Sequence, residues 1–378
     1  MTQTFDVAVI GAGIVGLAHA WMAARQGLNV VLFDRSSQAI GATVRNFGMV
    51  WPIGQPAGEL YETALRSREL WLELHTAGVI HADTCGALHL AHHDDELAVL
   101  EEFASGRTHD CTVLSIADTM DRAPIANPDG LRGSLWSPTE LRVNPRTAAA
   151  GIAAWLESRH GVQRQFNTPI VNVDADTITS ADGRQWRAER VIICSGSDLQ
   201  TLFPDVLAQS GLKLCKLQML RSVAQPATVR QHAHIASGLT LRHYTSFQHC
   251  PSLVRVKERF ADQNPDLDRY GIHVMATQSA NGEFILGDSH EYGDDMTPFD
   301  KAVIDTLILQ ELQKIIRLPD WTIKERWHGV YAKHSQRPIF EAQPQPNVFV
   351  SVGPGGAGMT MSFGLAERAW NKGMAVMQ

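Results

Sequence analysis

The stretch that decides the fold is FDVAVIGAGIVGLAHAWMAARQGLNVVLFDR, residues 5–35. It begins with a short apolar segment rich in β-branched residues, Phe5–Ile10, which predicts a strand. Apolar residues then recur at helical spacing over Ile14–Gln26, and a second apolar strand is expected over Asn29–Phe33. The sequence therefore predicts a β–α–β unit with a glycine-rich turn between its first strand and its helix.

That turn has the spacing Gly11-x-Gly13-x-x-Gly16. Gly11 is expected to make the tight turn, Gly13 to let the backbone approach a pyrophosphate, and Gly16 to let the helix pack on the strand. The first helical residues, Ile14 and Val15, offer unpaired N–H groups that bind phosphate. Together these features predict a dinucleotide site.

The second strand ends at Asp34, roughly twenty residues after the glycine turn, and Arg35 follows it. A carboxylate at this position accepts hydrogen bonds from an adenosine ribose and disfavours a ribose 2′-phosphate. We therefore predict that Asp34 and Arg35 contact either FAD or NAD.

A second glycine-rich turn lies near the other end of the chain, in NVFVSVGPGGAGMTMSFGLAERAWNKG. It is expected to join a strand over Val348–Val352 to a helix from about Met359 to Trp370. Two such turns more than three hundred residues apart favour one extended ligand touched at two places, with the helix dipole near the isoalloxazine ring. FAD is favoured, because NAD needs no second turn; an ordinary glycine-rich loop is the alternative. The predicted contacts are Gly353, Gly355, Gly356, Gly358, Met359 and Thr360.

Composition bounds the other possibilities. A chain of 378 residues favours two domains, and its net charge of −7 argues against a nucleic-acid partner. The longest N-terminal apolar run, Val7–Ala20, is too short to span a bilayer and lacks a basic leader, so we expect a soluble cytoplasmic protein without a membrane partner. The five cysteines are scattered without metal-ligand spacing, and the pair His92–His93 is interpreted as a helix start. No metal site is predicted.

The middle of the chain adds a third element. A helix is expected to open at Asn144-Pro145-Arg146 and continue to about His160. Strands are expected to follow it, at Ile170–Val173, Thr177–Thr179 and Arg190–Cys194. The last strand ends in a turn of small residues, where Ser195 and Gly196 are predicted to approach the adenosine or pyrophosphate, with Val171 as a further contact.

Together these segments resemble the D-amino-acid oxidase, glycine oxidase and sarcosine oxidase family of flavoproteins. The matching pieces are VAVIGAGIVGLAHAWMAARQGLNVVLFDR, GATVRNFGMV, LRVNPRTAAAGIAAW, ERVIICSGSD, ERWHGVYAKHSQRPIF and NVFVSVGPGGAGMTMSFGLAE. The resemblance implies an α/β plus β fold, with a Rossmann-like FAD-binding domain of the D-amino-acid-oxidase (GR2) type from residues 1–80, 141–215 and 328–378. A mostly antiparallel substrate domain is expected from 81–140 and 216–327.

Within the substrate domain, alternating sequence predicts strands over Lys216–Gln225 and Gly282–Tyr292, and a helix over about Asp300–Ile316. The family resemblance implies hydride transfer from the carbon bearing an amine to flavin N5, hydrolysis of the imine, and reoxidation by O2 to H2O2. The FAD is predicted to be noncovalent, since the sequence has no recognisable attachment motif. We expect a monomer or small homo-oligomer.

A narrower resemblance rests on RNFGMVWPIGQPAGELYETALRSRELWLEL, residues 45–74. This run is similar to a bacterial branch of the family associated with phosphonate catabolism and proposed to deaminate aminophosphonates. It implies oxidation of a compound like 2-aminoethylphosphonate to an aldehyde like phosphonoacetaldehyde. The alternative is an oxidase of amino acids or N-methyl amino acids of the glycine, sarcosine or D-amino-acid type.

In such a flavin fold, GATVRNFGMV would pass the pyrophosphate and reach the isoalloxazine ring. Asn46 and the amides of Gly48 and Met49 are then candidates to bind the N5 edge. Arg45 is expected to face either a cofactor phosphate or the anionic group of the substrate. The predicted contacts from this loop are Ala42, Thr43, Arg45, Asn46, Phe47, Gly48 and Met49.

Substrate choice is expected to depend on WHGVYAKHSQRPIF. Amino-acid-oxidising relatives carry Trp-x-Gly-x-Arg here, and the arginine forks onto a carboxylate; this chain has Tyr331 instead. We predict that Tyr331, Lys333 and Arg337, with Arg45, bind a phosphonate, which accepts several donors from different directions. The alternative is that Lys333 is a solvated loop charge and that Arg337 fixes a turn.

A short aromatic segment, LTLRHYTSFQHC, supplies the last candidates. Tyr244 is a predicted wall of the substrate site, and His249 a predicted acceptor of the amine proton. Ordinary core packing or surface exposure is the alternative for each. The flavin itself carries the hydride, so His249 and Tyr331 are the catalytic side chains considered.

Overall fold

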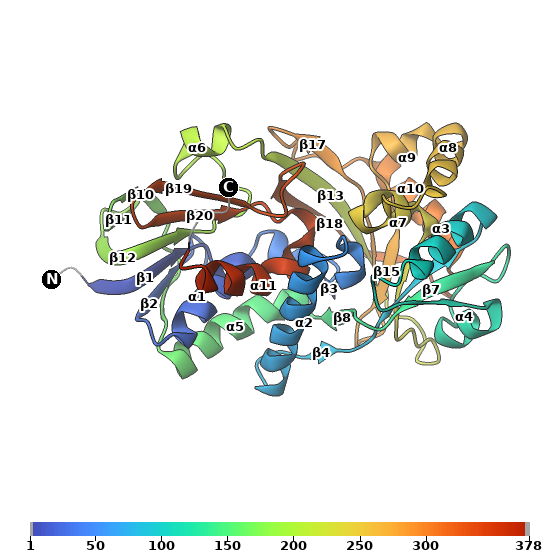
Figure 1. Cartoon of the computed structure of the whole chain (residues 1–378), viewed down its shortest axis with the longest axis horizontal. Helices are drawn as coiled ribbons and strands as arrows, with labels where there is room; N and C mark the ends of the chain where they lie inside the picture. Colours follow the sequence, from blue (N-terminus) through green and yellow to red (C-terminus); the bar gives the residue numbers. More distant parts are fainter. Residues whose placement is uncertain (1–2, 375–378) are drawn as a thin grey trace.

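A computed structural model of the chain describes residues 3–374, which form two large sheets lying side by side (Figure 1). The first sheet has the order β10-β11-β12-β1-β2-β9, with β20 beside β12 and β19 beside β20. Its centre is parallel, because β12, β1, β2, β9 and β20 pair in one direction. The strands are β1 Thr4–Ile10, β2 Val30–Phe33, β9 Gln163–Gln165, β10 Ile170–Asp174, β11 Thr177–Ser180, β12 Gln185–Ile193, β19 Phe340–Gln345 and β20 Val348–Val352.

Helices pack against one face of this sheet around a cluster of large aromatic residues. Trp21 and Trp71 both meet Phe363 edge-on, with ring centroids 5.3 and 4.9 Å apart. The indole N–H of Trp71 also donates to the carbonyl of Met359 at 2.8 Å. This cluster fixes the position of the helix that follows the second glycine turn. The helices are α1 Ile14–Arg25, α2 Glu59–Thr76, α5 Pro145–His160 and α11 Gly358–Asn371.

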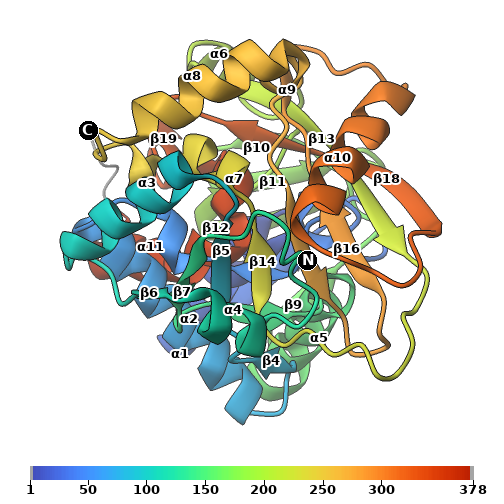
Figure 2. The ribbon, with the colours of Figure 1, turned by 90° about the vertical axis from the view of Figure 1, so that its right-hand side faces the viewer.

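The second sheet has the order β17-β13-β16-β15-β14-β5-β7-β6, with β18 beside β13. Within the described residues its pairs are antiparallel, apart from β14 with β5. Figure 2 shows helices in front of this sheet, among them α3, α8 and α10. The strands are β5 Ala87–Ala91, β6 Thr112–Leu114, β7 Gly133–Ser137, β13 Lys213–Ser222, β14 His234–Ala236, β15 Met275–Gln278, β16 Phe284–Gly287, β17 Glu291–Gly293 and β18 Ile323–Lys333.

The remaining elements are short or cover the second sheet. The helices associated with the second sheet are α3 Asp94–Ser105, α4 Ile116–Arg122, α7 Gly238–His243, α8 Leu253–Gln263, α9 Pro265–Arg269 and α10 Ala302–Ile315. A small sheet joins β3 Met49–Val50 and β4 Ala82–Asp83 to β8 Leu141–Val143, and α6 spans Pro204–Ala208. The 3-10 turns are Ala42–Val44, Pro52–Gly54, Thr245–Phe247 and Gly355–Ala357.

The N-terminal β–α–β unit, the strand Val348–Val352 and the helix from Pro145 to His160 all form as predicted. The predicted domain boundaries at 215/216 and 327/328 each fall inside a strand. β13 and β18 pair from Lys213–Lys333 to Ser222–Ile323, so both strands continue past those positions.

The single strand expected over Gly282–Tyr292 is divided into β16 and β17. The break follows Gly287, whose Cα is so close to Met219 that an added Cβ would lie 2.9 Å from its sulfur. Asp288 and His290 lie in this break, and Asp288 exchanges two backbone hydrogen bonds with His273, of 2.8 and 3.2 Å. The interruption therefore places polar side chains at the inner end of the sheet.

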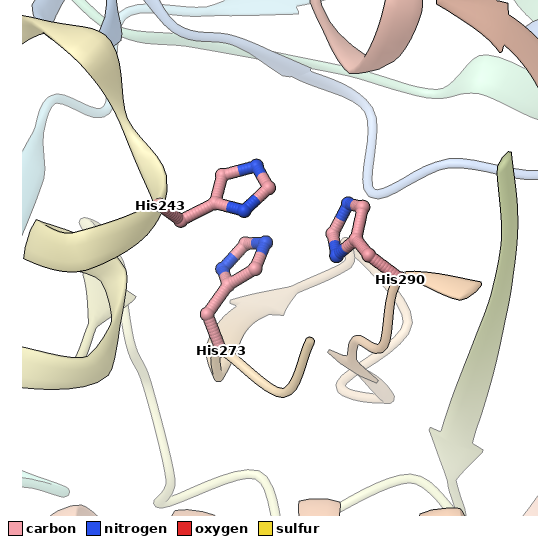
Figure 3. A group of neighbouring side chains, drawn as sticks. All are labelled: His243, His273 and His290. Carbon is pink, nitrogen blue, oxygen red and sulfur yellow. The ribbon is translucent and has the colours of Figure 1, made fainter. Parts of the chain in front are cut away.

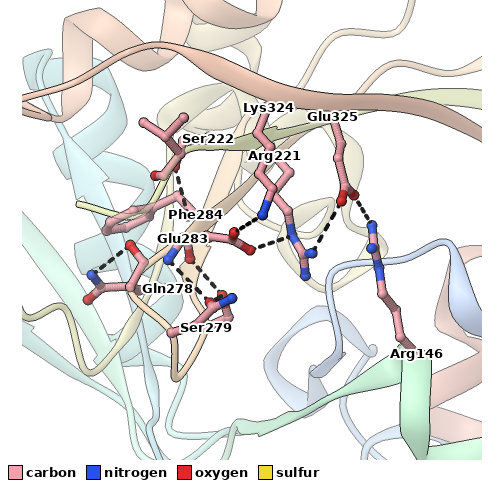
Figure 4. A network of polar contacts seen from close by, with 12 residues as sticks. Arg146, Arg221, Ser222, Gln278, Ser279, Glu283, Phe284, Lys324 and Glu325 are labelled. Carbon is pink, nitrogen blue, oxygen red and sulfur yellow. Dashed lines mark hydrogen bonds and ion pairs between the residues drawn. The ribbon is translucent and has the colours of Figure 1, made fainter.

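A chain of ion pairs joins α5 to the second sheet (Figure 4). Arg146 pairs with Glu325 at 2.5 Å, and Arg221 bridges Glu325 at 3.7 Å and Glu283 at 3.3 Å. Lys324 completes the network by pairing with Glu283 at 2.6 Å. Because Glu283 is buried, this compensation of its charge matters more than a surface pair does.

Crossing a bilayer requires a helix that is both long and apolar. Among the helices of residues 3–374, none combines that length with that composition.

Candidate active site

A cavity of about 940 Å³ extends between the two sheets. Its walls include the glycine turn after β1, the end of β2, the turn after β12 and the loop between β20 and α11. Its other end is lined by residues of β18, α7 and the break between β16 and β17. Parts of the chain predicted to hold a cofactor and a substrate thus face one continuous space.

The glycine turn is built as its spacing predicts. Gly11 has φ +108°, and a Cβ there would lie 2.2 Å from the carbonyl oxygen of Cys194. A Cβ on Gly16 would lie 1.8 Å from the carbonyl oxygen of Gly11, so only glycine allows the helix to approach. The hydroxyl of Thr43 accepts the N–H of Ile14 at 2.9 Å, which ties the loop after β2 to the start of α1.

The end of β2 is fixed by its own carboxylate. Asp34 accepts the N–H of Ala12 at 2.8 Å and that of Ser36 at 2.8 Å. Both Asp34 and Arg35 line the cavity, and Arg35 pairs with Asp198 at 2.9 Å. The turn after β12 therefore closes on the same end of the cavity, as the sequence predicts for Ser195 and Gly196. Val171 also lines this end.

The second glycine turn lies against β18. Gly353 and Gly355 have φ values of +76° and +59°. A Cβ on Gly355 would lie 3.0 Å from the side chain of Lys333, and one on Gly356 would lie 3.3 Å from the hydroxyl of Tyr331. This close packing brings the cofactor end of the cavity next to the predicted substrate residues.

Several of the predicted cofactor contacts stand behind the cavity wall. Gly16, Gly48, Met49 and Thr360 are not among the lining residues. Thr360 instead accepts the N–H of Trp51 at 2.9 Å. These residues shape the wall and do not face the space.

The side chain of Asn46 makes its hydrogen bonds within its own loop. Its side-chain amide donates to the carbonyls of Ala42 at 3.0 Å and Thr43 at 2.9 Å, and its oxygen accepts the N–H of Gly48 at 2.8 Å. Asn46 and the Gly48 amide, which are predicted to bind a flavin edge, thus already have hydrogen-bond partners within the loop. Their groups hold the loop in shape, and Gly48 adopts φ +78°.

Arg45 lines the cavity but is tied to β18. Its guanidinium donates to the carbonyl of His328 at 3.2 Å, and the indole of Trp327 donates to the carbonyl of Arg45 at 3.1 Å. The loop that Arg45 begins is thus fastened to the long strand of the second sheet. Arg45 also borders a hollow on the other side, beside Arg146 and Arg326.

We call the inner end of the cavity the chamber; its defining side chains are Tyr244, Asp288, Tyr331, Lys333 and the three histidines His243, His273 and His290. Tyr331 is buried, which raises the pKa of its phenol well above the usual value. Burial lowers the pKa of the Lys333 ammonium, whose Nζ lies 3.4 Å from the Tyr292 hydroxyl. The chamber therefore combines cationic, hydroxyl and imidazole groups.

Three histidines meet in the chamber (Figure 3). The rings of His243 and His273 stack with centroids 3.9 Å apart, and those of His273 and His290 are 4.9 Å apart. Nε2 of His273 lies 3.0 Å from a carboxylate oxygen of Asp288, while Nδ1 of His290 lies 3.2 Å from the carbonyl oxygen of Gly271. Burial lowers the pKa of His290 to about 4 and holds the pKa of His243 well below its usual value.

Two predicted substrate residues lie elsewhere. His249 is exposed and does not line the cavity; its ring lies 5.8 Å from that of Phe103. Arg337 is exposed at the mouth, in a turn where His334 accepts the N–H groups of Gln336 and Arg337 at 2.9 and 3.0 Å. The structure thus brings Tyr244, Tyr331 and Lys333 together and leaves His249 outside.

Comparison with known proteins decides the family. Residues 6–369 match the family model described as FAD dependent oxidoreductase. The chain belongs to this family.

Its relatives are distant in sequence. An opine oxidase component of Rhizobium meliloti is 27% identical over 235 residues, which are 57% of this chain and 62% of that relative's length. Glycine oxidase of Geobacillus kaustophilus is 24% identical over 211 residues, covering 52% of this chain and 56% of the relative. N-methyl-L-tryptophan oxidase of Escherichia coli is 26% identical over 239 residues, covering 56% and 58%. These alignments leave more than a third of each relative unmatched.

Solved structures show the fold over nearly the whole chain. The crystal structure of glycine oxidase from Geobacillus kaustophilus superposes with a TM-score of 0.78 at 18% identity, covering 99% of this chain and 96% of that one. L-proline dehydrogenase from P. horikoshii gives a TM-score of 0.74 at 17% identity, covering 99% and 95%. The predicted glycine-oxidase-type fold is confirmed.

The residues of this FAD-dependent oxidoreductase fit the cofactor of its family. At both places where the sequence predicts contact there is a glycine turn with no room for a Cβ. Asp34 and the turn after β12 line the same cavity. FAD would be held by the turn after β1, by Asp34 and by the turn after β20. The chamber then lies beyond the cofactor end, where a substrate belongs.

The sequence gives no indication of three chamber residues of this flavoprotein, His273, Asp288 and His290; His243 lies in the quoted segment LTLRHYTSFQHC, but no role is predicted for it. No local motif marks them, because they fall at strand ends that resemble ordinary turns. The antiparallel register that sets Met275 opposite Gly287 brings His273 next to Asp288. Only a prediction of that pairing would have found them.

Proposed function

We propose that this protein catalyses the FAD-dependent oxidative deamination of a small primary or N-substituted amine that carries a phosphonate group. The family and the continuous cavity support oxidation of a small molecule at its inner end. Relatives named glycine oxidase and N-methyl-L-tryptophan oxidase support an amine as the oxidised group. The two-electron chemistry is that of bound FAD, with O2 as acceptor and H2O2 as product.

The observation that carries the phosphonate is the set of donors around Lys333. Tyr331 occupies the position from which an arginine would fork onto a carboxylate, and Lys333 lies beside it in the chamber. An ammonium surrounded by hydroxyl and imidazole donors approaches an anion from several directions, which suits a tetrahedral group better than a planar one.

Of the three arginines that line the described cavity, two have partners on the protein and the third is exposed. Arg35 pairs with Asp198, Arg45 donates to the backbone of β18, and Arg337 is exposed at the mouth. One N–H of the Arg45 guanidinium binds the carbonyl of His328, so the position of Arg45 is set by β18. Lys333 is therefore the cation that we assign to the phosphonate.

His273 is the side chain that we assign to the amine proton. An amine must be neutral before the C–H bond next to it is oxidised, so a base close to the substrate raises the rate. Nε2 of His273 lies 3.0 Å from the Asp288 carboxylate, whose negative charge would stabilise the imidazolium that forms. Water then hydrolyses the imine to the aldehyde and releases ammonia from a primary amine, or the N-substituent as its amine from an N-substituted one.

A second candidate is an oxidase of amino acids or N-methyl amino acids. The names of the relatives favour it, since glycine oxidase and N-methyl-L-tryptophan oxidase both act on amines with a carboxylate. In that case Lys333 would bind the carboxylate as a single point charge.

A substrate screen separates the two functions. The FAD-loaded protein is mixed anaerobically with 2-aminoethylphosphonate, its N-methyl derivative, glycine, sarcosine or D-alanine, and bleaching of the flavin absorbance is followed. We expect an aminophosphonate to bleach the flavin fastest and to release H2O2 when O2 is admitted. Bleaching by the carboxylates alone would replace the proposal with the second candidate, and no bleaching by any amine would overturn both.

A further inference from the structure

The three chamber histidines come from three separate segments. His243 ends α7, His273 lies just before β15, and His290 lies in the break between β16 and β17. One nitrogen from each ring lies within 4.8 Å of the others (Figure 3). We propose that His243, His273 and His290 bind a transition-metal ion of the Zn²⁺ class, and that the bound ion excludes the amine from the chamber. This departs from the prediction that the chain has no metal site.

The ligand chemistry suits such an ion. Zn²⁺, Ni²⁺ and Cu²⁺ bind neutral imidazole nitrogen, and Zn²⁺ also takes carboxylate oxygen. Three imidazoles with one open position form a tetrahedral site of the kind in which Zn²⁺ keeps a water molecule.

The Asp288 carboxylate lies next to this set. Its side chain is 8% exposed, and its Oδ1 lies 3.0 Å from Nε2 of His273 but makes no hydrogen bond there of acceptable geometry. Nδ1 of His273 is likewise buried without a hydrogen-bond partner. Buried polar atoms without partners are uncommon. An ion bound through Nδ1 of His273 would use that free lone pair, and the nearby Asp288 carboxylate would favour a positive charge there.

The geometry requires a small rearrangement. Zn–N bonds of roughly 2.0–2.1 Å place tetrahedral ligand atoms about 3.3 Å apart, so nitrogens as far as 4.8 Å apart must approach one another. His243 is the ring that can move, because it is half-buried at the end of a helix, whereas His273 and His290 are buried. The carbonyl of Gly271 accepts from Nδ1 of His290 at 3.2 Å, which leaves its other nitrogen with the lone pair.

The charges around the cluster explain why the site would be regulatory and not permanently filled. Lys333 and Arg242 are the cations that act on His243, and they oppose a bound cation as well. The Asp288 carboxylate offsets them. Tyr331 and Lys333 line the same chamber, so an ion held by the histidines occupies the place that we assign to the amine.

Isothermal titration calorimetry of the FAD-loaded protein with ZnCl₂, after treatment with EDTA and in a buffer that does not bind metal, tests the site directly. We expect one equivalent per chain. His273→Asn and His290→Asn are each expected to weaken binding at least tenfold. His249→Asn is the matched control, since His249 is an exposed histidine that lies outside the cavity, and it should bind as the parent does. Unchanged flavin absorbance and circular dichroism show that each variant is folded.

Steady-state kinetics with the amine identified in the screen test the second half of the proposal. Zn²⁺ should raise the apparent KM for that amine at unchanged kcat, and EDTA should restore it. Absence of stoichiometric binding, or binding that both cluster variants leave intact, would overturn the site; binding without competition would overturn the exclusion. The inference rests on the proposed function only in this last step, because calorimetry is done without substrate and turnover is measured with EDTA present.

Discussion

The nucleotide end of the cavity and the chamber are built in opposite ways. The nucleotide end is dominated by one continuous stretch, in which Gly11, Gly16 and Asp34 act through backbone close to them in sequence or in the neighbouring strand. The chamber takes His243, Asp288 and Lys333 from segments far apart in the chain. At the nucleotide end, close backbone packing leaves no room for a side chain at Gly11 or Gly16. In the chamber, each segment contributes a separate functional group, so a single substitution can remove one group without changing the shape.

Replacement of Gly16 by valine should have the largest effect. A Cβ there would lie 1.8 Å from the carbonyl oxygen of Gly11, and neither backbone can move without separating α1 from β1. We expect purified protein without FAD and with a strongly lowered unfolding temperature, measured by the ratio of flavin to protein absorbance and by thermal unfolding.

Gly27→Ala is the control in the same β–α–β unit. Gly27 has φ +77°, yet a Cβ there has no neighbour within 4 Å. This variant should lose only the roughly 1–2 kcal/mol that a left-handed conformation costs alanine, and it should retain FAD. Equal FAD content in both variants would show that close packing at Gly16 is not what holds the turn.

Asp288→Asn tests the chemistry of the chamber without changing its shape. The amide cannot stabilise an imidazolium on His273, so flavin reduction by the amine should slow by roughly ten- to a hundredfold at neutral pH. Stopped-flow measurement of the anaerobic bleaching rate, from about pH 6 to 9, checks this.

FAD content should stay normal in Asp288→Asn, because the carboxylate lies away from the nucleotide end. Asp294→Asn serves as the control, since Asp294 is an exposed acid just beyond β17 that pairs with Lys213. If Asp288→Asn bleached the flavin at the parent's rate, the His273–Asp288 pair would have no role in taking the amine proton.

Lys333→Met should produce a smaller change that is specific to the anion. Loss of one charge-assisted contact costs roughly 1.5–3 kcal/mol, which corresponds to at least a tenfold rise in KM for the aminophosphonate. Arg337→Met should raise KM less than about threefold, because an exposed ion contact contributes little. Steady-state kinetics measure the KM of both variants. A larger rise in KM for Arg337→Met than for Lys333→Met would place the anion site at the mouth of the cavity.

The smallest effect concerns acid stability. His89 lies buried between Trp51 and Phe247, and burial lowers its pKa to about 3. An unfolded histidine takes up a proton near pH 6.5, so the unfolded state binds one more proton below that pH. The contribution of neutral His89 to the unfolding free energy is therefore fully present above pH 6.5 and is lost as the pH falls toward 3.

His89→Leu should make the unfolding free energy less dependent on pH between about 6.5 and 4, by at most about 1.4 kcal/mol per pH unit. Urea unfolding at several pH values measures this slope. His249→Leu, at an exposed position, should leave the slope unchanged. Equal slopes for His89→Leu and the parent would contradict a lowered pKa of His89 in the folded protein.

The sequence predicts more of the nucleotide end than of the chamber for a physical reason. The turn after β1 and the acid after β2 are set by short-range sterics and hydrogen bonds, so spacing alone identifies Gly11, Gly13 and Asp34. The position of the loop from Ala42 to Met49 follows from the sequence, but the roles of Asn46 and Gly48 do not, because their hydrogen bonds close within the loop.

By itself, the sequence determined the β–α–β unit, the second glycine turn, the FAD family and the presence of Tyr331 and Lys333 at the end of β18. Only the tertiary structure decided which histidines share the chamber: it gathers His243, His273 and His290 and leaves His249 outside. Proximity among such residues depends on how β13, β15, β16 and β18 pair, and pairing between distant strands is a long-range choice that leaves no periodic mark on any one segment.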